Sequence, residues 1–148
     1  MKGNSSALRK GRFSEAGQIY LVTFVTLQRK PVFKDFELGR LFVDVLRRES
    51  EHSETLAFVV MPDHVHWLVQ LKSKLLSRTV QSVKSVSSRK IKSQIISNGP
   101  VWQDGFHDHA VRNGDDLASI ARYLVMNPVR AGLVSSVKEY PLWDAVWV

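Results

Sequence analysis

The sequence predicts one α+β domain built on a split βαβ pattern. Its 148 residues are the usual length of a single domain, so residues 1–148 are expected to fold together. Short segments rich in β-branched and aromatic residues predict four strands, and two amphipathic patterns between them predict helices. The resulting order is β-α-β-β-α-β with one further helix near the C-terminus. This order is typical of the ferredoxin-like fold, an antiparallel sheet with helices on one face.

The first half of the chain supplies three strands and one helix. Residues 18–28 are apolar on both faces, which predicts a central, buried strand. Residues 37–50 carry leucine, phenylalanine and valine at helical spacing and predict an amphipathic helix. Residues 55–61 and 64–71 are further apolar strands. Only a Pro-Asp pair separates them, so we expect a tight hairpin.

The second half adds two helices and a strand. Residues 75–97 predict a long basic helix that ends before an Asn-Gly-Pro stop, and residues 106–112 alternate as a strand does. A last helix runs to about Met126, where an Asn-Pro pair ends or kinks it. Residues 1–17 are expected to form a basic N-terminal arm. Residues 133–148 form an aromatic tail, which is expected to dock on the domain.

Composition and charge narrow the function classes. The absence of cysteine excludes disulfides, thiolate metal sites and cysteine nucleophiles, and suits a reducing cytoplasm. No apolar run approaches the roughly 18–20 residues of a membrane span, and no signal peptide is evident. The net charge is +7, and no acidic residue occurs between Asp63 and Asp104. This balance favours a nucleic-acid partner over an anionic membrane.

Two His-x-His pairs are candidate metal ligands. In a strand, residues i and i+2 share a face, so His64 and His66 would place two imidazoles side by side. His107 and His109 have the same spacing. The third predicted strand is central in the ferredoxin-like order, and this mildly favours His64 and His66. Either pair could instead be surface or hydrogen-bonded histidines, and spacing alone leaves that choice open.

The last helix carries a candidate nucleophile. Tyr123 falls beside the apolar stripe of that helix, and Asn127 lies one turn later on the same side. A phenol and an amide so placed could face one site. Tyr123 could equally pack at the helix edge while Asn127 caps the helix. Of the other tyrosines, Tyr20 lies in an apolar strand and Tyr140 in the tail, so Tyr123 is the candidate if any tyrosine reacts.

Three blocks of the sequence resemble one protein family. They are Phe58–Leu71, with its Pro-Asp-His-Val-His core, Trp102–His109, and Tyr123–Val134, with its Asn-Pro-Val-Arg-Ala-Gly run. In this order they resemble the HUH single-strand transposases of the IS200-like group, and in particular the REP-associated tyrosine transposases. The likeness covers roughly residues 12–147.

The resemblance implies a set of roles. In this family the histidine pair and the amide one turn after the nucleophile bind a divalent metal, Mg²⁺ or Mn²⁺, which assigns His64, His66 and Asn127. Tyr123 would attack DNA and become linked to its 5′ phosphate, which makes the last helix the catalytic one. The 107–109 block is not the family's metal site.

The resemblance also implies partners and a location. The substrate would be single-stranded or hairpin DNA, namely the repetitive extragenic palindromes (REPs) of bacterial genomes, which the protein would cleave and rejoin near the hairpin. The protein would be cytoplasmic and nucleoid-associated, act as a monomer or homodimer, and need no membrane.

Basic residues are the candidate DNA contacts, because lysine and arginine follow the backbone of a single strand while aromatic residues can stack on its bases. The candidates are Arg9, Lys10, Arg12, Lys84, Arg89, Lys90, Lys92, Arg112 and Arg130. Trp67 and Trp102 are expected to belong to the core rather than to stack on bases.

Three other functions remain open from the sequence. A non-catalytic module that binds hairpin DNA or RNA would need neither His64 nor Tyr123. A metal-dependent phosphodiesterase would use metal-bound water and tolerate Tyr123→Phe. A replication or relaxation initiator would share the chemistry, but its usual extra domain does not fit into 148 residues.

Overall fold

One antiparallel sheet of five strands forms the centre of the structure, a computed structural model that describes residues 17–49, 52–73, 75–95, 99–112 and 115–147. The strand order is β4-β1-β3-β2-β5. The strands are β1 (Ile19–Val25), β2 (Ser53–Val60), β3 (His64–Leu71), β4 (His107–Val111) and β5 (Trp143–Ala145). The first four follow the ferredoxin-like arrangement with β1 and β3 at the centre, so the predicted fold class is confirmed.

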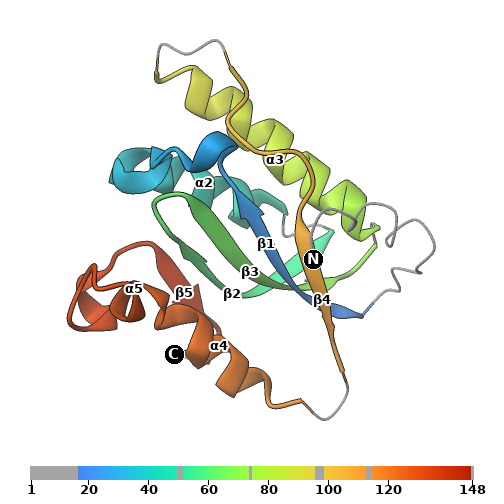
Figure 1. Cartoon of the computed structure of the whole chain (residues 1–148). Coiled ribbons are helices and arrows are strands. Elements are labelled where there is room, and N and C mark those ends of the chain that lie inside the picture. Colours follow the sequence, from blue (N-terminus) through green and yellow to red (C-terminus); the bar gives the residue numbers. More distant parts are fainter. Residues whose placement is uncertain (1–16, 50–51, 74, 96–98, 113–114, 148) are drawn as a thin grey trace.

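Helices cover both faces of this sheet. Helices α2 (Phe36–Arg48) and α3 (Leu76–Lys92) lie on one face, and α4 (Leu117–Val125) with the short α5 (Asn127–Arg130) lies on the other (Figure 1). The carboxylates of Asp35 and Asp116 accept hydrogen bonds from the first turns of α2 and α4, which explains where both helices begin. No helix in the described part of the chain is long and apolar enough to cross a bilayer.

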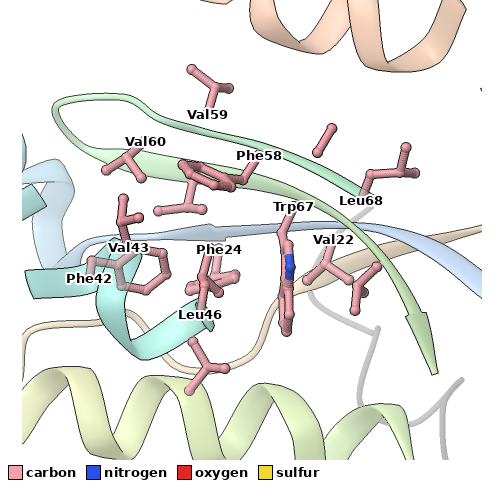
Figure 2. Close-up of a cluster of buried hydrophobic side chains, with 14 of the residues drawn as sticks. Val22, Phe24, Phe42, Val43, Leu46, Phe58, Val59, Val60, Trp67 and Leu68 are labelled. Atoms are coloured by element: carbon pink, nitrogen blue, oxygen red, sulfur yellow. The ribbon is translucent and has the colours of Figure 1, made fainter. Parts of the chain in front are cut away.

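The core lies between the sheet and α2. Along β1, Tyr20, Val22 and Phe24 are buried. The Phe24 ring lies 5.8 Å from that of Phe42 on α2 and 4.9 Å from that of Trp102. Figure 2 shows Phe24, Phe42 and Trp67 in this layer.

Both candidate stacking tryptophans are core residues. Trp67 and Trp102 are 0% and 6% exposed, as the sequence predicted. Their indole nitrogens donate to the hydroxyls of Thr55 and Ser87, at 2.8 and 3.0 Å, so burial leaves neither donor unsatisfied.

The tail docks through a strand that the sequence did not predict. Residues Trp143–Ala145 pair with β2 and become the edge strand β5. The buried Tyr140 hydroxyl donates to the Val60 carbonyl at 2.6 Å, and the Val60 amide donates to the Leu142 carbonyl at 2.9 Å. These contacts fasten the tail to the end of β2, beside the turn that leads into β3.

Several predicted boundaries were too long. Strand β1 ends at Val25 instead of residue 28, because the next residues form two short 3₁₀ helices, η1 (Leu27–Arg29) and η2 (Val32–Lys34). Another 3₁₀ helix, η4 (Val137–Glu139), precedes β5. Helix α3 ends at Lys92 instead of residue 97, and residues 96–98 lie outside the described residues.

Candidate active site

Two histidines lie side by side on the central strand β3. His64 and His66 point to the sheet face that α4 covers, and their ring centroids are 4.8 Å apart. The Nδ1 atom of His64 lies 2.7 Å from Oδ1 of Asp63. The Nδ1 atom of His66 lies 2.9 Å from Oγ1 of Thr23, its partner across the sheet on β1. Each ring is thus oriented through Nδ1, which leaves Nε2 as the nitrogen for a ligand.

Burial and the surrounding groups favour the neutral imidazole at His66. Burial, the nearby His64 and Arg130 together lower the pKa of His66 to about 4, with burial the largest cause. Burial acts to raise the pKa of Asp63, but hydrogen bonds from His64 and Arg29 outweigh it and hold the pKa below its usual value. At neutral pH, His66 is therefore uncharged and Asp63 is ionised, and neutral imidazole is the form that binds metals.

Tyr123 and Asn127 face the same region from the junction of α4 and α5. Pro128 lacks the amide hydrogen that would bond the carbonyl of Leu124 four residues earlier, and the side-chain Nδ2 of Asn127 donates to that carbonyl at 2.8 Å. The amide therefore caps the end of α4, and this orientation leaves its Oδ1 as an acceptor. The two roles predicted for Asn127, helix cap and metal ligand, are compatible because the cap uses Nδ2 and a metal would bind Oδ1.

A cavity of about 610 Å³ joins these elements. Its lining includes His66 from β3, Tyr123 from α4, and Asn127 and Arg130 from α5. Tyr123 is 68% exposed, and the guanidinium carbon of Arg130 lies 3.8 Å from the centre of its ring. His64 borders the lining residue His66 through their ring contact.

The second histidine pair lies on the edge strand. His107 and His109 belong to β4, which β1 separates from β3. His107 is opposite Thr23 and His109 is opposite Leu21 in the register of the sheet. His109 nevertheless contributes to the cavity wall, as His66 does.

The side chains present fit a divalent cation with open coordination. Among the described residues, no cluster of three His, Cys, Asp or Glu side chains could hold a metal. His64 and His66 with the Asn127 amide oxygen would form a set of two nitrogens and one oxygen, in which both imidazoles already have partners on Nδ1. Such a set leaves room for substrate oxygens and water.

The candidate DNA contacts occupy different environments. Arg89, Lys90 and Lys92 lie in the last turns of α3, and the exposed Arg112 follows β4. The Nζ atom of Lys84 instead donates to the carbonyls of Gln103 and Gly105, both at 2.7 Å, and so holds the loop before β4. Three further candidates in the basic arm lie outside the described residues; they are Arg9, Lys10 and Arg12.

Two supporting residues were missed in the sequence. Asp63 directly precedes His64 in the sequence, and this adjacency could have identified it as a partner of the histidine. The Pro-Asp pair predicted only a turn. Thr23 is 43 positions from His66 and meets it only through the register of β1 against β3. No local pattern would have identified it.

Most of the chain matches one known protein family. Residues 15–127 match the family described as "Transposase IS200 like", which is well over half of the chain. The chain belongs to the IS200-like transposase family. This membership confirms the predicted resemblance and makes the protein a transposase, an enzyme of DNA recombination.

Two curated relatives of this IS200-like transposase come from bacteria. A Haemophilus influenzae protein described as a REP-associated tyrosine transposase is 28% identical over 138 residues, which is 84% of this chain and 78% of the relative. A REP-associated tyrosine transposase of Escherichia coli is 33% identical over 95 residues. That alignment covers 60% of this chain and 52% of the Escherichia coli protein.

Solved structures share the fold. A REP-associated tyrosine transposase bound to a REP hairpin superposes with a TM-score of 0.70 at 24% identity, covering 89% of this chain and 79% of that one. A transposase from Deinococcus radiodurans superposes with a TM-score of 0.56 at 23% identity, covering 83% of this chain and 95% of that one. Both likenesses show that the IS200-like transposase has the fold of this group.

Proposed function

We propose that this transposase cleaves and rejoins single-stranded DNA at or near REP hairpins through a covalent link between Tyr123 and a 5′ phosphate. The observation that carries the proposal is the cavity that joins Tyr123 to His66 and Asn127. Tyr123 is the tyrosine among the described residues that line this cavity; it is exposed and shares the lining with the neutral imidazole of His66 and the amide of Asn127. This combination suits phosphoryl transfer and leaves room for a nucleic-acid strand.

The substrate class rests on the relatives and on charge. Both curated relatives are named for REP association, and one structural neighbour holds a REP hairpin. The net charge of +7 fits a polyanionic partner. Because the relatives are bacterial, the DNA in question would be that of the bacterial nucleoid.

The proposed interface combines the basic residues of the site, of α3 and of the N-terminal arm. The protein would act on DNA as a single domain, either as a monomer or as a homodimer.

The reaction conserves the number of phosphodiester bonds. The Tyr123 oxygen would attack the phosphorus, lose its proton, and form a phosphotyrosine while the bond to the 3′ oxygen breaks. The departing 3′ oxygen takes up a proton and becomes a hydroxyl. A second 3′ hydroxyl can reverse the exchange, so strands are rejoined without ATP.

His64, His66 and Asn127 would hold the divalent metal, Mg²⁺ or Mn²⁺. When bound, such an ion neutralises charge on the phosphate and orients it for in-line attack. The chain's own contribution is to fix the two imidazoles through Asp63 and Thr23, and to place Tyr123 and Arg130 on the opposite wall.

The deciding experiment is a covalent-adduct assay. The protein is mixed with a labelled single-stranded oligonucleotide carrying a REP hairpin and Mn²⁺, and then denatured. We expect a DNA adduct with the wild type and none with Tyr123→Phe, which should fold normally because Tyr123 is 68% exposed.

Other outcomes separate the alternatives. Cleavage that survives Tyr123→Phe would replace the proposal with metal-dependent hydrolysis by water. Tight hairpin binding with neither cleavage nor adduct, across a panel of palindromes, would show a binding module.

A further inference from the structure

The loop after β1 supports the turn that directly precedes His64. The backbone amide of Thr26 donates to the carbonyl of Asp63 at 3.0 Å, and the amide of Phe33 donates to the carbonyl of Pro62 at 3.0 Å. The Thr26 hydroxyl donates to the Lys30 carbonyl at 2.7 Å, within the loop, and its oxygen also lies 3.1 Å from the Asp63 carbonyl. Two backbone hydrogen bonds from one loop therefore fix the two-residue turn immediately before β3.

The same loop reaches the turn with a charged side chain. The Nη1 atom of Arg29 donates to Oδ2 of Asp63 at 3.1 Å, while Oδ1 of Asp63 lies 2.7 Å from Nδ1 of His64. Each carboxylate oxygen thus has its own partner. Asp63 and His64 are partly buried, at 27% and 19% exposure, which strengthens their interaction relative to a pair in open solvent.

Backbone strain occurs at the residue that makes this contact. Gln28 and Arg29 have φ angles of 57° and 54°, and they are the non-glycine residues with positive φ within the described part of the chain. A left-handed conformation is unfavourable for a residue with a Cβ. Such strain concentrates at functional sites, where the surrounding contacts hold it in place. Here the strained pair places the Arg29 side chain against Asp63.

The two imidazoles are oriented by different chemistry. An ionised carboxylate can only accept a hydrogen bond, so Nδ1 of His64 is the donor to Asp63, and the neutral form of the ring keeps its lone pair on Nε2. The hydroxyl of Thr23 can donate or accept, and it leaves the tautomer of His66 open. A defined tautomer is therefore built into one ring of the pair only.

We infer that Arg29 and Asp63 are positioning residues for His64, with Asp63 fixing the ring and its tautomer and Arg29 fixing Asp63. This inference rests on the proposed role of His64 as a metal ligand. Neither residue touches the DNA or the reacting atoms in this scheme. They keep the Nε2 lone pair free and correctly oriented before a cation binds. The ring therefore does not have to change its tautomer when the cation binds.

The first test reads the tautomer without metal, DNA or turnover. Long-range ¹H–¹⁵N spectra of the full chain are recorded at pH 8 with a chelator, and the signals of His64 are assigned with His64→Gln. We expect the wild-type ring to be protonated on Nδ1 in a single tautomer. Asp63→Asn should give a mixture, because an amide can donate as well as accept. Arg29→Gln should give a smaller change in the same direction.

The second test measures Mn²⁺ affinity by calorimetry. We expect Asp63→Asn to weaken binding about 10-fold or more, which is the usual effect of losing such a partner, and Arg29→Gln to weaken it less. Arg29→Lys keeps the charge and should restore part of the loss. Asp44→Asn and Arg40→Gln on the exposed side of α2 make the same charge changes and should leave both readouts unchanged.

Two results would overturn the inference. One is a wild-type His64 that is protonated on Nε2 or is an even mixture of tautomers. The other is an Asp63→Asn variant that matches Asp44→Asn in both tautomer and Mn²⁺ affinity. Failure of the adduct assay would leave the tautomer result standing, so the two proposals fail separately.

Discussion

The guanidinium of Arg130 covers the ring of Tyr123 at 3.8 Å. Among the described residues that line the cavity, Arg130 is the one permanent cation, and no carboxylate occurs. A cation–π contact at an exposed site contributes only about 0.5–1 kcal/mol. A charge-assisted hydrogen bond to a phosphate is stronger, so the Arg130 guanidinium can leave the Tyr123 ring and bind a phosphate oxygen of an incoming DNA strand. We therefore expect Arg130 to hold Tyr123 over the cavity and then to bind the phosphate under attack.

Arg130→Gln separates this role from general DNA binding. We expect the rate of single-turnover cleavage to fall about 10- to 100-fold, because Arg130 would stabilise mainly the transition state. Each tenfold step corresponds to roughly 1.4 kcal/mol of lost transition-state stabilisation. Hairpin affinity should change less than about threefold, since one phosphate contact among several is lost. The matched control is Arg122→Gln on α4, where the guanidinium bonds the Ser119 hydroxyl instead. Equal losses of rate and affinity in the Arg130 variant would contradict this role.

At the scale of elements, the tail stabilises the hairpin that carries the site. The Tyr140 hydroxyl donates to the carbonyl of Val60, and the amide of Val60 donates to the carbonyl of Leu142. Val60 is the last residue of β2, and the turn to β3 follows at once. The Leu142 side chain packs against Gly39 in α2, where a Cβ would force it to shift. The tail therefore links α2, β2 and the β2–β3 turn, which explains why this aromatic segment is ordered against the domain.

Tyr140→Phe tests this link. The change leaves the buried carbonyl of Val60 without the hydroxyl donor, so we expect a loss of about 1–3 kcal/mol in the free energy of unfolding, measured by urea denaturation. Tyr123→Phe removes the same atom from an exposed side chain and should cost less than about 0.5 kcal/mol. If the two variants were equally stable, the tail would not contribute through this bond.

At the scale of the whole molecule, the excess of positive charge should govern binding to DNA. Each neutralised phosphate of a single strand contributes about −0.7 to the slope of log affinity against log salt. We expect Arg89→Gln with Lys92→Gln to reduce the magnitude of that slope by about 1.4 if both residues contact phosphates. Fluorescence anisotropy of a labelled hairpin across a salt series measures it. An unchanged slope would show that both side chains stay solvated.

Lys84→Gln is the internal contrast in the same helix. Its ammonium bonds two loop carbonyls, so this variant should lose about 1 kcal/mol of stability while the salt slope changes little. A fall in slope without a loss of stability would instead make Lys84 a phosphate contact, as the charge pattern alone suggested.

The order of elements could be predicted because each element is encoded by its own residues. Strand β3 spans His64–Leu71 as expected, Tyr123 lies on α4, and the Asn-Pro pair begins α5 just after α4 ends. Periodicity, caps and proline act over a few residues, so they can be read without knowing the fold. The strand predicted over residues 18–28 was too long, because the 3₁₀ helices and positive φ angles after Val25 depend on bonds to the β2–β3 turn.

The sequence by itself determined strands β1 to β4 and helices α2 to α4, the excess of basic residues and the three blocks that identify the family. Only the tertiary structure decided which residues meet. Thr23 reaches His66 across 43 positions, Arg29 reaches Asp63 across 34, and Tyr140 reaches Val60 across 80. Such contacts are set by strand register and by the packing of α4 and the tail on the sheet. Because these are collective outcomes of burying one shared core, no local pattern contains them.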